Sequence, residues 1–218
     1  MNINAIFGIM GLMGGILCAV GDLLFDLKGK DNQKLGTSGN IDSNWLKMSY
    51  WRFGVSILFA FVGDILAGFG YLSLVRQISQ TDQTLATVTA VLCYIGIIGG
   101  FFVHTVLCIQ PVIYKKIMET NQFRLADDTL EQYYKMLIAP FFIGYGSMLA
   151  GAVCVIIAIL TDALNVPKWF VLLNPIVFLI IGVSFRKIRP DKFYDLPGII
   201  MPSLGLGMLG MIAAVSAL

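Results

Sequence analysis

The chain has 218 residues, of which 57% are hydrophobic and 13% are charged, and its formal net charge is +2. Soluble globular domains carry about 25% charged residues, so this chain has too few charges to cover the surface of a soluble globule. The composition therefore indicates an integral membrane protein with the lipid bilayer as its partner, and the small net charge gives no reason to expect a nucleic acid.

Six stretches are continuously apolar over about the 20 residues that a membrane-spanning helix requires. Because they do not alternate between apolar and polar residues, they favour helices over the strands of a barrel. The stretches cover residues 4–26, 52–76, 85–113, 136–160, 168–186 and 196–217. The sequence thus predicts one all-α integral membrane domain over residues 1–218, a bundle of six transmembrane helices.

Basic residues are concentrated in alternate connections between these stretches. Residues 27–52, 114–135 and 186–195 hold all but two of the 15 Lys and Arg residues. Connections rich in Lys and Arg stay in the cytoplasm. This pattern predicts that these three connections are cytoplasmic and that both termini lie outside.

The connection at 114–135 has a helix-start signal of its own. Asp128 has the character of an N-cap, and Glu131 follows three residues later. The fourth helix is therefore expected to begin before its apolar part. Whether this polar portion lies on the membrane surface or is an ordinary solvated connection stays open.

Small residues recur at helical spacing in the first and last stretches. Gly11 and Gly15 are four residues apart, and Ser203, Gly207 and Gly210 line one side of the sixth stretch. In lipid, small residues allow helix backbones to approach closely. We expect these seams to hold the helices in one bundle, and the alternative is a homo-oligomer formed through the same seams.

The four cysteines lie inside apolar stretches and form no C-x-x-C pair, a placement that favours small packing residues over disulfides or a zinc site. They are Cys18, Cys93, Cys108 and Cys154. The chain has one histidine. We therefore expect neither a metal ion nor a cofactor.

Asp64 is the first candidate for a functional residue. It lies near the middle of the second stretch, about as far from either surface as a residue can be. A charged Asp at the centre of a span costs about 2.5–3.5 kcal/mol on insertion scales, so it needs a partner, water or a proton. We interpret Asp64 as a proton, cation or ligand site, and the alternative is a hydrogen-bonded Asp that only orients helices.

Asp22 and Asp26 are four residues apart at the cytoplasmic end of the first stretch, so both carboxylates share one helix face. Arg52 enters the second stretch from the same side. A structural Asp–Arg clamp is the favoured interpretation of Arg52, ahead of a phosphate-binding arginine.

His104 lies in the third stretch, at a depth between Asp64 and Asp22. An intramembrane histidine suits proton transfer, although a hydrogen-bonded packing role is equally open. Asn174-Pro175 interrupts the fifth stretch. Such interruptions mark either a binding site or a simple kink, because proline frees a backbone carbonyl.

Three segments of the first quarter of the sequence carry a resemblance to a known family: GDLLFDLKGK at 21–30, IDSNW at 41–45 and WR at 51–52. Through these residues the chain resembles an uncharacterised family of small multi-pass bacterial membrane proteins. The resemblance implies a multi-pass protein of the bacterial cytoplasmic membrane, and it implies no activity.

Three functions stay open. The first, which we favour, is a carrier or binder of a small polar or amphipathic solute, linked to protons through intramembrane Asp and His side chains. The second is a non-catalytic assembly or stress-response protein. The third is an enzyme that acts on lipid headgroups at the cytoplasmic face, which the missing G-x-S-x-G, H-E-x-x-H and P-loop motifs disfavour. No catalytic residue is assigned, and the ligand or proton site is expected among Asp64, His104, Asp22, Asp26, Arg52 and Asn174.

Overall fold

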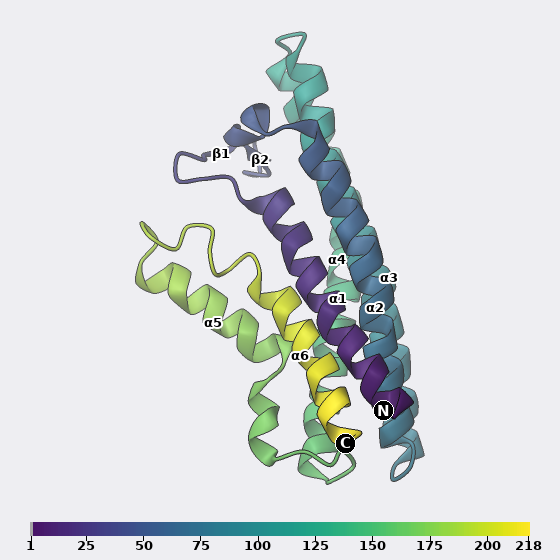
Figure 1. Cartoon of the computed structure of the whole chain (residues 1–218). Coiled ribbons are helices and arrows are strands. Elements are labelled where there is room, and N and C mark those ends of the chain that lie inside the picture. Colours follow the sequence, from purple (N-terminus) through teal and green to yellow (C-terminus); the bar gives the residue numbers. More distant parts are fainter. Residues whose placement is uncertain (1) are drawn as a thin grey trace.

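The computed structural model describes residues 2–218, and these residues form six α-helices that run back and forth through one bundle (Figure 1). The all-α prediction is confirmed. Two short 3-10 helices, at Ser43–Lys47 and Lys168–Leu172, and a small antiparallel pair of strands, β1 (Lys34–Leu35) and β2 (Ile41–Asp42), complete the structure. The helices are α1 (Ile3–Asp26), α2 (Tyr50–Ile78), α3 (Gln83–Met118), α4 (Phe123–Leu160), α5 (Pro175–Ile188) and α6 (Met201–Ser216).

Helices α1 to α4 are each long and apolar enough to cross a membrane. The last two stretches give shorter helices, because α5 has 14 residues and α6 has 16. At about 1.5 Å per residue these two helices reach roughly 21 and 24 Å, less than the hydrocarbon core of about 30 Å. Residues 168–172 form a 3-10 helix, and Asn174 with Pro175 starts α5 instead of kinking it. A bundle of six full spans therefore stays a prediction.

Both termini lie at the same end of the bundle (Figure 1). The side-chain amide of Asn2 donates a hydrogen bond to the carbonyl of Ala217 over 3.3 Å, which joins the first and last turns of the chain. The three connections rich in Lys and Arg lie toward the opposite end, where β1, β2 and the α3–α4 turn are found (Figure 1). Below, this opposite end is called the basic end.

Glycine seams set the distances between the central helices. α1 packs between α2 and α6, and α3 packs along α4. A Cβ built on Gly15 would lie 2.3 Å from the Cα of Gly207, and one built on Gly99 would lie 2.6 Å from the Cα of Gly144. Such contacts are possible only without a side chain. The predicted seams of the first and sixth stretches thus form an interface within the chain.

The hairpin of α3 and α4 projects beyond the other helices at the basic end (Figure 1). α4 begins at Phe123, well before its apolar part, as expected from the sequence. The predicted cap at Asp128 is wrong, because the left-handed backbone of Asn121 (φ 56°) already turns the chain and the helix starts soon after it.

The long connection between α1 and α2 folds back over the basic end of the bundle. Trp45 lies edge-on to Tyr114 of α3, with ring centroids 6.0 Å apart, and Leu130 of α4 belongs to the same buried cluster. Ile117 and Met118 are partly buried and pack against this cluster. The connection is therefore a packed cap with its own small core.

Candidate functional site: a polar cavity among five helices

A cavity opens between α1, α2, α3, α4 and α6, and the centre of a water-sized sphere can reach about 60 Å³ of it. Two carboxylates and one histidine line it, and none of its lining residues is Lys or Arg. The remaining wall is apolar or carries hydroxyl and thiol groups. Its polar and aromatic lining residues are Cys18, Asp22, Asp64, Tyr71, His104, Tyr145 and Ser203. We call this space the inner cavity.

A second and more open space, of which the centre of a water-sized sphere can reach about 320 Å³, adjoins it toward the basic end, and we call it the outer cavity. The two spaces share part of their walls, including Asp22, His104 and Ser203. The outer cavity continues to charged residues of the first connection, among them Lys28 and Asp42. Polar residues shared by the two spaces thus lie between Asp64, deep in the bundle, and the loops at the basic end.

Asp64 contacts the thiol of Cys18, with Sγ 3.7 Å from Oδ1. The backbone of α1 comes this close because Gly63 precedes the aspartate, and a Cβ at Gly63 would lie 2.5 Å from the same sulfur. Within residues 2–218, no Lys, Arg or His nitrogen lies within ion-pair distance of the Asp64 carboxylate. Asp64 is therefore a carboxylate inside the helical bundle that faces a cavity and has no basic partner among the described residues.

Asp22 and His104 form the second part of the site. The Nδ1 atom of His104 lies 3.4 Å from Oδ1 of Asp22, and Nε2 lies 2.8 Å from Oγ of Ser56. The Ser56 hydroxyl also bonds the carbonyl oxygen of Gly21 over 2.7 Å. Ser203 of α6 donates to the other Asp22 oxygen over 2.5 Å, so this carboxylate joins three helices.

These contacts fix where the protons lie. The carbonyl of Gly21 can only accept, so the single hydroxyl proton of Ser56 points to it, and Nε2 of His104 must donate to Ser56. A neutral His104 would then turn the lone pair of Nδ1 toward a carboxylate. The pair Asp22–His104 is favourable only if it holds one further proton, either as imidazolium with carboxylate or as imidazole with carboxylic acid.

Arg52 lies outside both cavities. Its Nε donates to the carbonyl of Leu24 over 2.9 Å, and its guanidinium also donates to the carbonyl of Leu27 over 3.0 Å. Among the described residues it forms no ion pair, so the expected clamp to Asp22 or Asp26 is absent. The physical reason is that the last carbonyls of α1 have no intrahelical partners, and the guanidinium satisfies them.

Asn174 also lies away from the cavities and works as a cap. Its side-chain oxygen accepts from the backbone N–H groups of Ile176 (2.9 Å) and Val177 (3.3 Å), and its amide donates to the carbonyl of Val171. Its side chain is buried. These bonds satisfy the first turn of α5 and account for Asn174 without a ligand.

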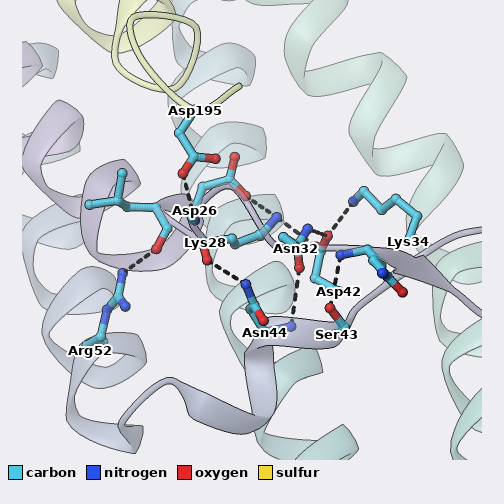
Figure 2. Close-up of polar contacts among 12 residues, drawn as sticks. Asp26, Lys28, Asn32, Lys34, Asp42, Ser43, Asn44, Arg52 and Asp195 are labelled. Atoms are coloured by element: carbon cyan, nitrogen blue, oxygen red, sulfur yellow. Dashed lines mark hydrogen bonds and ion pairs between the residues drawn. The ribbon is translucent and has the colours of Figure 1, made fainter. Parts of the chain in front are cut away.

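Asp26 belongs to an ion-pair cluster that closes the basic end (Figure 2). Lys28 pairs with Asp26 and also lies 2.7 Å from Asp42, while Lys34 lies 2.9 Å from Asp42. Asn32 donates to Asp42 over 2.6 Å. Every charge in this group has a partner, and we call the group Asp26, Lys28, Lys34 and Asp42 the loop cluster.

In the loop cluster, ion pairing affects the pKa values of the side chains more strongly than burial does. Burial alone would raise the pKa of the Asp42 carboxyl, but the charge and hydrogen bonds of Lys28, with those of Asn32 and Lys34, hold the pKa below its ordinary value. Burial alone would lower the pKa of Lys28, but Asp26 and Asp42 hold it above its ordinary value. Both side chains therefore stay charged near neutral pH.

The loops that carry this cluster are tied to other parts of the basic end. The N–H of Gly29 donates to Asp195 of the α5–α6 connection over 2.8 Å (Figure 2). The backbone N–H and the hydroxyl of Thr37 both bond Asp127 near the start of α4. Three segments that are far apart in sequence thus meet over the outer cavity.

Sequence analysis missed several residues of the inner cavity. Cys18 was interpreted as packing, although it lies four residues before Asp22 on the same helix face. Tyr71 was one of several unranked tyrosines within the apolar stretches, although it follows Asp64 by seven residues on one helix face. These spacings were visible, and projecting each helix around its aspartate would have found both residues.

Ser56 and Ser203 gave no such signal, because their role depends on how the helices are rotated against one another. In the part of the chain that the structure describes, no group of three or more His, Cys, Asp or Glu side chains is placed to hold a metal ion.

Comparisons with known proteins identify the chain at the level of its family only. No curated protein and no solved structure matches it. The profile of a family of unknown function (DUF6796) matches residues 1–218. The chain therefore belongs to this family of unknown function.

Proposed function

We propose that this protein is a membrane carrier or binder of a small amphipathic solute, and that solute binding is linked to proton binding in the inner cavity. The observation that carries the proposal is Asp64, a carboxylate deep among apolar helices that faces a cavity and, within residues 2–218, has no basic partner at ion-pair distance. Such a group costs folding free energy, and a protein keeps it when function requires it.

The shape and lining of the two cavities support a solute with polar and apolar parts. The inner cavity places Ala60, Ala67 and Leu206 beside Asp64, so an apolar body can lie next to the carboxylate. The outer cavity leads from there toward the polar loops. Mostly apolar pockets with a few convergent polar groups are the usual form of small-molecule sites.

The proton linkage is supported by the order of hydrogen bonds around His104. The hydroxyl proton of Ser56 is used in the bond to Gly21, and the Nε2 proton of His104 is used in the bond to Ser56. The Asp22–His104 pair holds one further proton, between Nδ1 and the carboxylate. This pair lies between Asp64 and the loops and lines both cavities. A proton on Asp64 therefore has a second site on its way to the basic end.

The proposal includes the setting in the membrane. α5 and α6 complete a bundle of six spans, both termini lie outside, and the basic end faces the cytoplasm of a bacterial cell. Support comes from the concentration of Lys and Arg in the connections of the basic end. The proposed enzyme of lipid headgroups has less support, because Arg52 bonds backbone carbonyls instead of facing a cavity.

The test is proton-coupled flux in proteoliposomes that contain a pH-sensitive dye, with a panel of amines, amino acids, organic acids and sugars. We expect at least one class of solute to move protons with wild-type protein and with Asp191→Asn, an exposed aspartate outside both cavities. Asp64→Asn should lose that coupling. Wild-type protein that neither binds nor moves any member of the panel would overturn the proposal.

A further inference from the structure

The charges of the inner cavity are those of a cation site. Asp22 and Asp64 line it together with one histidine, and Lys and Arg are absent from its wall. If His104 carries its proton, it balances Asp22 and leaves one negative charge on Asp64. If the proton lies on Asp22 instead, the pair is again neutral, and the same single negative charge is left on Asp64. Because a charge away from water needs a partner, a monovalent cation complements this cavity and an anion does not.

Tyr71 gives a second, independent sign of a ligand. Its side chain is only 8% exposed and lines the cavity beside Asp64. Among the described residues its hydroxyl has no hydrogen-bond partner, and the oxygen is not one of the fully enclosed polar atoms, so it keeps accessible surface that a ligand can contact. Tyr145 of α4 also lines the cavity. Tyrosine rings attract organic cations through their faces, so the two tyrosines suit a charged nitrogen that carries carbon substituents.

The rest of the wall has room for an apolar body. Gly96, Gly100 and Gly144 line the side formed by α3 and α4. A Cβ built on Gly100 would meet no atom within 4 Å, so the wall there borders open space. Met148 and Leu206 add flexible apolar surface. A bare metal cation would leave this apolar surface unused.

The route to the inner cavity is compatible with a cation. Lys28 and Lys34 lie along the outer cavity, but Asp26 and Asp42 neutralise them. Asp22 adds a negative charge where the two cavities meet.

The geometry points to a small organic ammonium ion as the ligand of the inner cavity, with its charged nitrogen near Asp64 and Asp22 and its apolar body against Tyr71 and Tyr145. This inference rests on the proposed function, because it names the class of solute that the same site takes.

Competition with protons follows from this placement. A proton and an ammonium ion neutralise the same carboxylate, so binding of the cation must weaken as the pH falls and must release protons. The titratable groups that face Asp64 from the packed helices are Cys18 and Asp22 of α1, Tyr71 of α2, His104 of α3 and Tyr145 of α4, and α6 contributes only the hydroxyl of Ser203.

The experiment compares two ligands of nearly the same shape on the purified full-length protein in mild detergent. Benzyltrimethylammonium is the cation, and neopentylbenzene, in which carbon replaces the charged nitrogen, is its neutral counterpart. We expect the cation to bind at least about tenfold more tightly to wild-type protein, because the carboxylate and the rings act on charge. Its affinity should increase with pH, and calorimetry in two buffers should detect proton release.

Variants locate the effect. Asp64→Asn should weaken the cation about tenfold and leave the neutral ligand unchanged, while Asp64→Glu should keep the preference for the cation. Tyr71→Phe keeps the ring and should bind the cation nearly as wild type does, and Tyr71→Leu should bind it more weakly. Asp191→Asn is the matched control.

Equal binding of both ligands by wild-type protein, or tighter binding of phenylmethanesulfonate, would overturn the cation inference. The comparison of the two ligands uses wild-type protein, so it tests the cation inference even if Asp64→Asn does not fold. Either result would leave the carrier or binder proposal standing, because it would still show a solute in the site. That proposal fails separately, if neither these ligands nor any solute of the flux panel binds or moves.

Discussion

The inner cavity and the loop cluster each contain two aspartates, and they differ in how these carboxylates are paired. In the loop cluster, Lys28 lies between Asp26 and Asp42, and Lys34 gives Asp42 a second partner. In the inner cavity, the one hydrogen-bond contact of the Asp64 carboxylate within residues 2–218 is the weak contact of the Cys18 thiol. The comparison teaches that charge pairing, and not charge itself, separates carboxylates that hold a fold together from those available to a ligand.

The largest expected effect comes from removing the shared cation of the loop cluster. Lys28→Met leaves Asp42, whose side chain is 2% exposed, without its closest lysine. Breaking a buried pair costs about 3–5 kcal/mol, and the ion pair that Asp42 keeps with Lys34 should hold the loss toward the lower end of that range. Denaturant unfolding should show this loss.

Lys30→Met is the matched control, since Lys30 is exposed and forms no ion pair within residues 2–218. If both variants unfold at the same denaturant concentration, the loop cluster does not stabilise the fold.

The pH dependence of the loop cluster is a milder way to break the same pairs. The pKa of Asp42 lies below its ordinary value of 3.8, so its stabilising contribution is present above that pH and is lost as the pH falls through its folded-state pKa. The pKa of Lys28 lies above 10.5, so its contribution is present below that pH and is lost in stronger base. The rate at which pepsin cleaves residues 27–49, divided by its rate on an unfolded substrate at the same pH, should rise only below about pH 3.8. A cleavage rate that does not change with pH across that range would argue against the pairing.

A smaller effect is expected from removing the Ser56 hydroxyl, which contacts His104 and the Gly21 carbonyl. Ser56→Ala removes the partner of His104 Nε2 and of the Gly21 carbonyl. Leaving such buried groups unpaired costs about 1–3 kcal/mol. Because His104 loses the bond that orders its protons, the pH profile of solute-coupled proton flux should also shift. Ser147→Ala, outside both cavities, should change neither property. A stability loss with an unchanged pH profile would limit Ser56 to packing.

The smallest effect is expected at Arg52, which touches neither region's carboxylates. Arg52→Met removes hydrogen bonds to the last turn of α1 and should cost about 1 kcal/mol, the usual size for a cap. Solute affinity should stay at the wild-type value. A loss of affinity larger than the loss of stability would place Arg52 in the binding machinery after all.

The sequence predicted the helices best where apolar length and helix coincide. The stretches 4–26 and 52–76 differ from Ile3–Asp26 and Tyr50–Ile78 by two residues or fewer at each end. The prediction failed where an apolar segment does not form an α-helix, as in the 3-10 helix Lys168–Leu172. The reason is that hydropathy measures the free energy of transfer to lipid and not backbone conformation.

The candidate site was predictable in its residues but not in its assembly. The free-energy cost of placing an ionisable side chain within an apolar stretch singled out Asp64, Asp22 and His104. The structure places all three around one cavity. Arg52 and Asn174 were included because a charge or a helix break near a span often marks function, but both satisfy helix ends. Which faces meet depends on close contacts such as Gly15 with Gly207, and no single helix reveals them.

The most direct test of the comparison is the thermal stability of Asp64→Asn and Asp42→Asn, measured side by side in one detergent. If the two regions differ as described, Asp42→Asn melts well below wild type, because Lys28 loses a buried partner. Asp64→Asn melts at the wild-type temperature or above it, because its carboxylate stabilises nothing in the empty protein. If Asp64→Asn loses as much stability as Asp42→Asn, Asp64 is a structural group and the proposed solute site is contradicted.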